Sequence, residues 1–112
     1  MKNNMRPVHP GEVLRADFLE PLGMTPHALS KALNVTPARI NEIVREQRGV
    51  SAETAIRLAR FFGGDAQSWL NLQQAYDLKI AERTVLKKVL KDVKPMNVSV
   101  LTRSDDGFAL AA

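Results

Sequence analysis

The side chains best suited to chemistry lie close together in the first half of the chain. An arginine can place two parallel N–H donors on the edge of a guanine, and an asparagine can both donate to and accept from an adenine. Arg39 and Asn41 therefore suit contacts with the base edges of double-stranded DNA. Thr36 is expected at the start of the same helix, where oriented amide groups attract a phosphate oxygen. Candidates for further phosphate contacts share a positive charge in this stretch: Lys31, Arg45 and Arg48.

Glu42 lies among these residues and carries the opposite charge. A carboxylate here repels phosphates unless it accepts a hydrogen bond from a cytosine amino group or pairs with a neighbouring arginine. Both alternatives stay open in the sequence, and for any single residue an ordinary solvated helix face is a third. The positions expected to point away from the core are Pro37, Ala38, Arg39, Asn41, Glu42 and Arg45.

The sequence contains no catalytic or metal-binding pattern. The chain has no cysteine, which excludes thiol catalysis, disulfides and thiolate metal sites. His9 and His27 lack the spacing of metal ligands. The serines have no glycine-flanked nucleophile motif, and no glycine-rich phosphate loop is present. We therefore expect no enzymatic activity, no metal and no cofactor.

Two short helices must position the polar stretch. Each begins with a threonine N-cap followed by proline, at Thr25-Pro26 and at Thr36-Pro37. Asn34 tolerates the left-handed conformation that a sharp turn between them requires. Such a pair crosses at a steep angle, so that the second helix, expected over 36–46, can enter a major groove. The positions expected to face inward are Leu29, Leu33, Val35, Ile40 and Ile43.

Three further helices complete an all-helical prediction. The first opens at His9-Pro10 and ends at Gly23, the fourth runs from Ser51 to Gly63, and the fifth from Asp65 to Pro95. The apolar positions of the fourth are Ala55, Ile56, Leu58, Ala59 and Phe62. Those of the fifth are Trp69, Leu72, Tyr76, Ile80, Leu86, Val89, Leu90 and Val93, of which Trp69, Leu72 and Tyr76 are expected in the core or at a dimer interface.

The length of the chain indicates a single domain, flanked by a short polar arm and a C-terminal tail. The 112 residues predict a flexible arm over 1–8, a helix-turn-helix domain over 9–94 and a tail over 95–112. Alternation after Pro95 and the turn dipeptide Asp106-Gly107 are compatible with a short β-hairpin, and a disordered tail is an equal alternative. The net charge of +4 suits a phosphate-rich partner. Without a membrane span or signal peptide, we expect a soluble, cytoplasmic protein.

Several motifs in the same order resemble the HigA antitoxin branch of the XRE (phage-repressor-like) family, whose domain is lambda-repressor-like. They are 9–14 (HPGEVL), 35–44 (VTPARINEIV), 48–51 (RGVS), 55–63 (AIRLARFFG) and 69–78 (WLNLQQAYDL). The resemblance covers about residues 9 to 80. It implies a homodimer that represses its own operon by binding a palindromic operator. It also implies a partner toxin, a small, basic, HigB-like endoribonuclease that cleaves mRNA and that the antitoxin holds inactive.

Two features depart from what the resemblance implies. Glu46 stands where the family commonly has a glycine that ends the recognition helix. A chain of positive charge cannot attract a basic toxin by its overall field, so contact must rest on apolar surface or on local acidic groups such as Asp17, Glu20 or Asp77. The alternatives to an antitoxin are a stand-alone XRE-type transcriptional regulator and a protein-interaction module with vestigial DNA binding.

Overall fold

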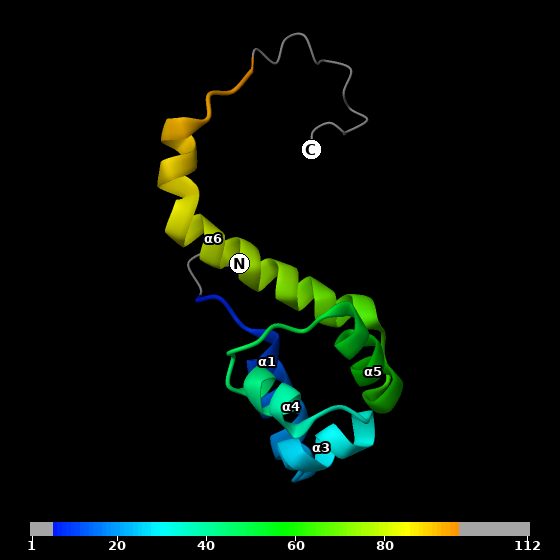
Figure 1. The fold of residues 1–112 in the computed structure, drawn as a ribbon. Coiled ribbons are helices and arrows are strands. Elements are labelled where there is room, and N and C mark those ends of the chain that lie inside the picture. Colours follow the sequence, from blue (N-terminus) through cyan, green and yellow to red (C-terminus); the bar gives the residue numbers. More distant parts are fainter. Residues whose placement is uncertain (1–5, 97–112) are drawn as a thin grey trace. The chain divides into compact units, whose positions relative to one another are not determined.

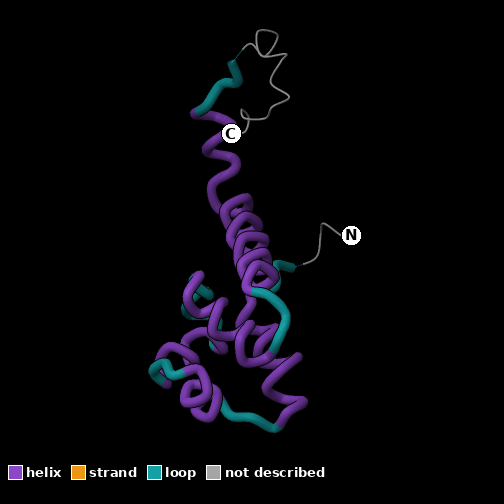
Figure 2. The backbone as a smooth tube through the Cα atoms, turned by 90° about the vertical axis from the view of Figure 1, so that its right-hand side faces the viewer, coloured by secondary structure: helices purple, strands orange, loops and turns teal. Residues whose placement is uncertain are grey.

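The computed structural model describes residues 6–96, and the regular structure of these residues is entirely helical (Figures 1 and 2). The expected five-helix, all-α architecture is confirmed for this part of the chain. The possible hairpin over 98–110 and the first five residues of the arm lie outside the described residues. Two compact units divide the chain, residues 1–81 and 82–112. The helical elements are α1 (Pro10–Val13), η1 (Leu14–Leu19), α2 (Glu20–Leu22), α3 (Pro26–Leu33), α4 (Pro37–Val44), α5 (Ala52–Phe62) and α6 (Ala66–Asp92).

The first helix is continuous from α1 through α2 but changes its hydrogen-bond register in the middle. Within η1 the helix widens to a π-turn, so that the Glu20 N–H donates to the carbonyl of Arg15, five residues back. Pro21 follows directly, and a proline ring crowds the carbonyl four residues before it while offering no N–H of its own. The helix therefore passes the proline and ends at Gly23, which has a left-handed φ of 63°.

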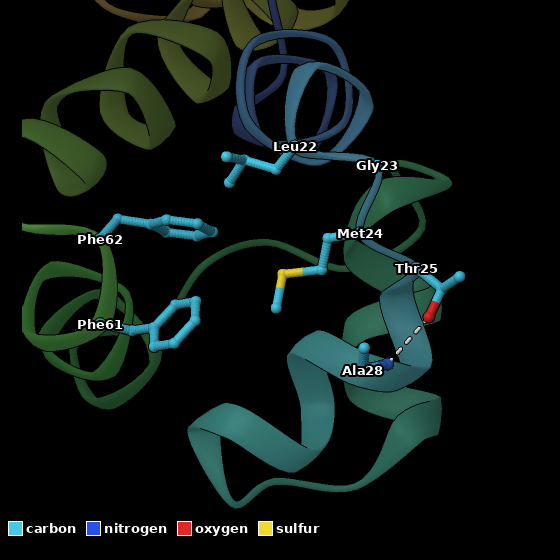
Figure 3. Close-up of a pocket in the computed structure, with 7 residues that line it drawn as sticks. All are labelled: Leu22, Gly23, Met24, Thr25, Ala28, Phe61 and Phe62. Atoms are coloured by element: carbon cyan, nitrogen blue, oxygen red, sulfur yellow. Dashed lines mark hydrogen bonds between the residues drawn. The ribbon is translucent and has the colours of Figure 1, made fainter.

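Local capping signals account for the starts of the other helices. In each case a side-chain oxygen accepts from a backbone N–H three residues on, and this satisfies one of the orphan donors of the first turn. All four predicted N-caps are confirmed. The pairs are Thr25 with Ala28 (3.0 Å; Figure 3), Thr36 with Arg39 (3.2 Å), Ser51 with Thr54 (3.2 Å) and Asp65 with Ser68 (2.8 Å).

The turn between α3 and α4 is built as the sequence predicts. Asn34 adopts a left-handed conformation with φ 59°, and the Val35 N–H donates to the carbonyl of Ser30 at 3.0 Å. This closes the end of α3 and sends the chain sharply into α4. The five predicted inward positions are confirmed. Leu29, Ile40 and Ile43 are fully buried, and Leu33 and Val35 pack with them.

Two predicted apolar faces are only partly buried. On α5 the core contacts come from Thr54, Ala55 and Leu58, whereas Ile56 is 60% exposed, so its expected core position is wrong. On α6 Trp69 is buried, but every residue from 81 to 96 is exposed. A helix of 27 residues is about 40 Å long, which exceeds the width of a small domain. Within residues 6–96, the apolar side chains of its distal part are exposed instead of buried: Leu86, Val89, Leu90 and Val93.

The start of α1 lies against the backbone of α4. His9 is 3% exposed, its Nδ1 accepts from the Gly11 N–H at 2.8 Å, and its ring packs edge-on against Tyr76 with centroids 4.8 Å apart. A Cβ on Gly11 would lie 1.8 Å from the carbonyl oxygen of Ile43. Only a glycine permits this approach, so position 11 fixes how closely the first helix packs on α4.

We predict that Gly11→Ala lowers the free energy of unfolding by at least about 2 kcal/mol, because the new methyl group meets a backbone carbonyl that cannot rotate away. Gly49→Ala is the matched control. The atoms nearest its Cβ belong to the Gln73 side chain, which can shift, so we expect a loss of about 1 kcal/mol from a weakened hydrogen bond between Gln73 and the Val50 N–H. Urea unfolding of both variants checks the difference, and equal losses would contradict the assigned role of Gly11.

The buried imidazole of His9 makes stability depend on pH. Desolvation lowers the pKa of His9 below its ordinary value of 6.5, and the carboxylates of Glu46 and Asp77 oppose the shift more weakly. The unfolded chain then binds a proton at a pH where the folded chain does not. The stability that neutral His9 contributes is fully present above pH 6.5 and is lost as pH falls through the lowered pKa.

Urea unfolding of the wild type at pH 7.5 and pH 5 is therefore expected to give a lower free energy at pH 5. His9→Asn retains an oxygen that can cap the helix and removes the titrating group, so its dependence on pH in this window becomes shallower. His27→Asn, at an exposed position, is the control and leaves the dependence unchanged. A wild-type slope that survives in His9→Asn would assign the effect to other groups.

Candidate nucleic-acid interface

The beginning of α4 is exposed to solvent and carries the polar residues that the sequence singles out. Thr36, Pro37 and Ala38 are all exposed, and Arg39 and Asn41 are half-buried. Since Ile40, Ile43 and Val44 take the buried face of this helix, the remaining positions point outward. Pro37 has no N–H and Thr36 caps the N–H of Arg39, so Ala38 supplies the first-turn amide that can meet an anion.

Arg39 lies within an ion-pair chain that links three helices. Its Nη1 lies 3.8 Å from Oε1 of Glu53, at the start of α5. Oε2 of Glu53 accepts from Arg57 at 2.8 and 3.1 Å, and Arg57 also donates to the carbonyl of Leu33, at the end of α3, at 2.8 Å. The hydrogen bonds and charge of Arg57, followed by the charge of Arg39, lower the pKa of Glu53. Glu53 is therefore an anchored carboxylate beside the candidate base-reading arginine.

Glu42 pairs with a neighbouring arginine, which is one of the alternatives that the sequence leaves open. Its Oε1 accepts from Nε of Arg48 at 2.8 Å, and both side chains are nearly half exposed. This pair neutralises the charge that Arg48 would otherwise present. Arg45 and Lys31, the other candidates for phosphate contact, are exposed and make no ion pair with a described residue.

The end of α4 shows how the chain accommodates Glu46 in place of a glycine. Glu46 has a left-handed φ of 64°, a conformation that costs a side-chain-bearing residue about 1–2 kcal/mol. Arg15, from the first helix, donates to the carbonyl of Val44, and its Nη2 lies 3.5 Å from Oε2 of Glu46. The guanidinium thus caps the last turn of α4 and holds Glu46 in place.

The three residues that the sequence placed in the core or a dimer interface differ in their surroundings. Trp69 is 6% exposed and belongs to the core of its own chain, where its ring lies 5.4 Å from that of Phe18. Leu72 and Tyr76 are half-buried, and Tyr76 packs on His9. Among residues 6–96 no group of three metal-ligating side chains forms, and no helix is long and apolar enough to span a membrane.

An open apolar hollow lies between the end of the first helix, the start of α3 and the end of α5 (Figure 3). Its volume is about 620 Å³, and no charged side chain lines it. Leu22 and Phe61 are 63% and 44% exposed, and the ring of Phe61 packs against that of Phe62 at 4.9 Å. Its lining residues are Leu22, Gly23, Met24, Thr25, Ala28, Phe61 and Phe62. Exposed apolar surface of this kind is typical of sites that contact another protein.

Comparison with known proteins matches the helix-turn-helix family model to residues 16–69. The chain is 67% identical over 82 residues to virulence-associated protein I of Dichelobacter nodosus, which covers 73% of this chain and 76% of that protein. It is 39% identical over 100 residues to antitoxin HigA-1 of Vibrio cholerae, and the match covers 88% of this chain and 92% of that protein. The solved Pseudomonas aeruginosa antitoxin HigA with the higBA promoter is 47% identical, with a TM-score of 0.79 over 81% of this chain and 99% of that one.

The capped α3–α4 pair, with its exposed second-helix start, defines a helix-turn-helix protein of the non-enzymatic, DNA-binding kind. Within that class, the chain belongs to the HigA-type antitoxins of the XRE family.

Proposed function

We propose that this protein is the antitoxin of a type II toxin–antitoxin pair and represses its own operon by binding operator DNA. The observation that carries the proposal is the exposed start of α4, with Arg39 and Asn41 facing outward from a fully buried opposite face. The Pseudomonas aeruginosa relative, which shares the fold over nearly its whole length, was solved with promoter DNA. Binding to operator DNA also implies that the protein acts in the cytoplasm, where we expect the operator to lie.

The roles of the individual residues follow from their positions on α4. We assign base contacts to Arg39 and Asn41 and phosphate contacts to the Thr36 end of the helix, in keeping with the donor and acceptor patterns of the major groove. Arg48 supplies a further phosphate contact once its pair with Glu42 opens. The full proposed set is Thr36, Pro37, Ala38, Arg39, Asn41, Glu42, Arg45, Arg48 and Lys31.

We also propose that the protein acts as a homodimer. Two copies place their recognition helices about 34–36 Å apart, in successive major grooves of a palindromic site. The apolar side chains of distal α6 support this, because Leu90 and Val93 are 70% and 60% exposed in a single chain and burial of such side chains favours association. Light scattering of the purified protein measures the oligomeric state directly.

The toxin partner is proposed to be a small, basic, HigB-like endoribonuclease. Because the antitoxin carries a net charge of +4, contact with a basic toxin rests on apolar surface and local acidic groups. The hollow at Leu22 and Phe61 offers the apolar surface. Asp17 and Glu20 are exposed on the helix that ends beside it, so we propose this region as the toxin contact.

Arg39→Ala is expected to weaken binding to the protein's own promoter DNA by about 1–3 kcal/mol, or roughly 5- to 150-fold, if Arg39 makes a bidentate contact with guanine. Binding to an unrelated duplex changes much less, because no base pair there is matched to Arg39. Fluorescence anisotropy titrations with both duplexes measure the two losses. Equal losses would make Arg39 a phosphate contact.

Arg48→Ala is expected to weaken binding to both duplexes alike. A lost phosphate contact releases fewer counterions, so the logarithmic salt dependence becomes shallower by about one. The same titrations at four salt concentrations give this slope. An unchanged slope would remove Arg48 from the set of phosphate contacts.

The decisive test of the antitoxin role is growth rescue. The small reading frame adjacent to this gene is expressed alone and then together with this protein, with arrest in the first case and recovery in the second. Leu22→Lys is expected to abolish rescue while leaving promoter binding intact, because it places a positive charge in the hollow. A neighbour that is harmless, or toxic without rescue, would instead make this protein a stand-alone regulator.

A further inference from the structure

Two arginines proposed to contact DNA each pair with a carboxylate in the free protein. Arg48, in the turn after α4, pairs with Glu42 on α4, whereas Arg39 on α4 pairs with Glu53 on α5. Unlike Glu42, Glu53 also accepts two hydrogen bonds from a second arginine, Arg57. Arg57 in turn donates to the carbonyl of Leu33. Moving this carboxylate away from Arg39 would break both of its hydrogen bonds to Arg57, although its side chain is 60% exposed.

We infer that Glu53 is a positioning residue that sets the sequence selectivity of Arg39, by favouring its contact with a base edge over a contact with phosphate. The inference deepens the proposed function and rests on it. Its physical basis is the chain of contacts from Leu33 through Arg57 and Glu53 to Arg39, which joins α3, α5 and α4.

The number of donors on Arg39 makes the two contacts unequal. A guanidinium has five N–H donors, and Glu53 lies nearest Nη1 of Arg39, which leaves Nη2 and Nε for a second partner. The O6 and N7 atoms of a guanine are uncharged acceptors that such a pair can reach while Glu53 stays in place. A phosphate in the same position brings a full negative charge toward the Glu53 carboxylate, and the repulsion opposes that contact.

Glu53 therefore acts against binding to DNA of the wrong sequence. When the base opposite Arg39 offers no matching acceptors, the arginine stays with Glu53 and contributes little to binding. Natural interfaces gain specificity through such unfavourable elements as well as through attractive ones. On unrelated DNA, where phosphate contacts provide most of the affinity, the anchored carboxylate removes one positive charge from the interface.

The test is Glu53→Gln, which keeps the shape of the side chain and removes its charge. Binding is measured to a duplex from the protein's own promoter and to an unrelated duplex of equal length and composition, at several salt concentrations. We expect binding to the unrelated duplex to tighten about 3- to 10-fold, with a salt dependence steeper by roughly one because Arg39 gains a phosphate. Promoter binding stays equal or weakens, so selectivity falls several-fold.

Glu82→Gln removes the same charge from the exposed distal part of α6 and is the matched control. If the two variants change the affinity for each duplex by the same factors, net charge explains the result and the inference is overturned. Glu53→Gln is also made in an Arg39→Ala background, where it should no longer affect selectivity. An effect that persists without Arg39 would assign selectivity to another residue.

A purely structural role for Glu53 predicts a different pattern. Loss of the Arg57 contact would then lower the unfolding temperature and weaken binding to both duplexes equally, and this outcome would overturn the inference. Glu53→Asp retains the charge and is expected to restore part of the selectivity. A wild-type protein without preference for its promoter would overturn the proposed function and this inference together. A wild-type preference that Glu53→Gln retains would overturn the inference alone.

Discussion

The burial of Ile40 and Ile43 is the constraint on which the rest of the interface depends. Both side chains are fully buried among the leucines of α3, and together they fix the rotation of α4 about its axis. Because side chains on a helix are spaced by about 100°, this rotation decides that Arg39 and Asn41 face outward. Two contacts from the first helix then hold α4 in this orientation. Gly11 approaches the Ile43 carbonyl closely, and Arg15 caps the carbonyl of Val44. The outward-facing chemistry of α4 is thus set by apolar and backbone contacts on the opposite side of the helix.

The electrostatics of this surface are more balanced than the net charge suggests. Arg39 and Arg48 each lie beside a carboxylate, and Arg15 lies beside Glu46. Exposed ion pairs of this kind contribute little to stability, so their main effect is on the charge that the protein presents to a partner. A net charge of +4 therefore says less about affinity for DNA than the geometry of a few pairs does.

Local features of the fold were predictable from the sequence, and non-local ones were not. The caps at Thr25, Thr36, Ser51 and Asp65 and the left-handed turn at Asn34 depend on residues within four positions of each other, so their types and spacing predict them. The exposure of Ile56 depends on which side of α5 meets the other helices, which periodicity alone does not decide. The partners of Arg15 and Arg39 lie 31 and 14 residues away, and no local pattern signals them. The i,i+4 spacing of Glu53 and Arg57 was a readable signal, but only the fold brings Arg39 to it.

The length of α6 has a consequence for how the helix persists in solution. The core residues of the described part of the chain all precede residue 81, and residues 81–96 are exposed, so unwinding the last turns of α6 exposes no buried side chain among residues 6–96. An isolated helical segment of a dozen residues is only marginally stable in water, and segments with few buried contacts open with little free energy. In a lone protomer these turns therefore fray and exchange their amide hydrogens quickly. When another surface covers Leu86, Val89 and Leu90, the same turns become protected, so the helical content of this segment registers whether the protein is assembled.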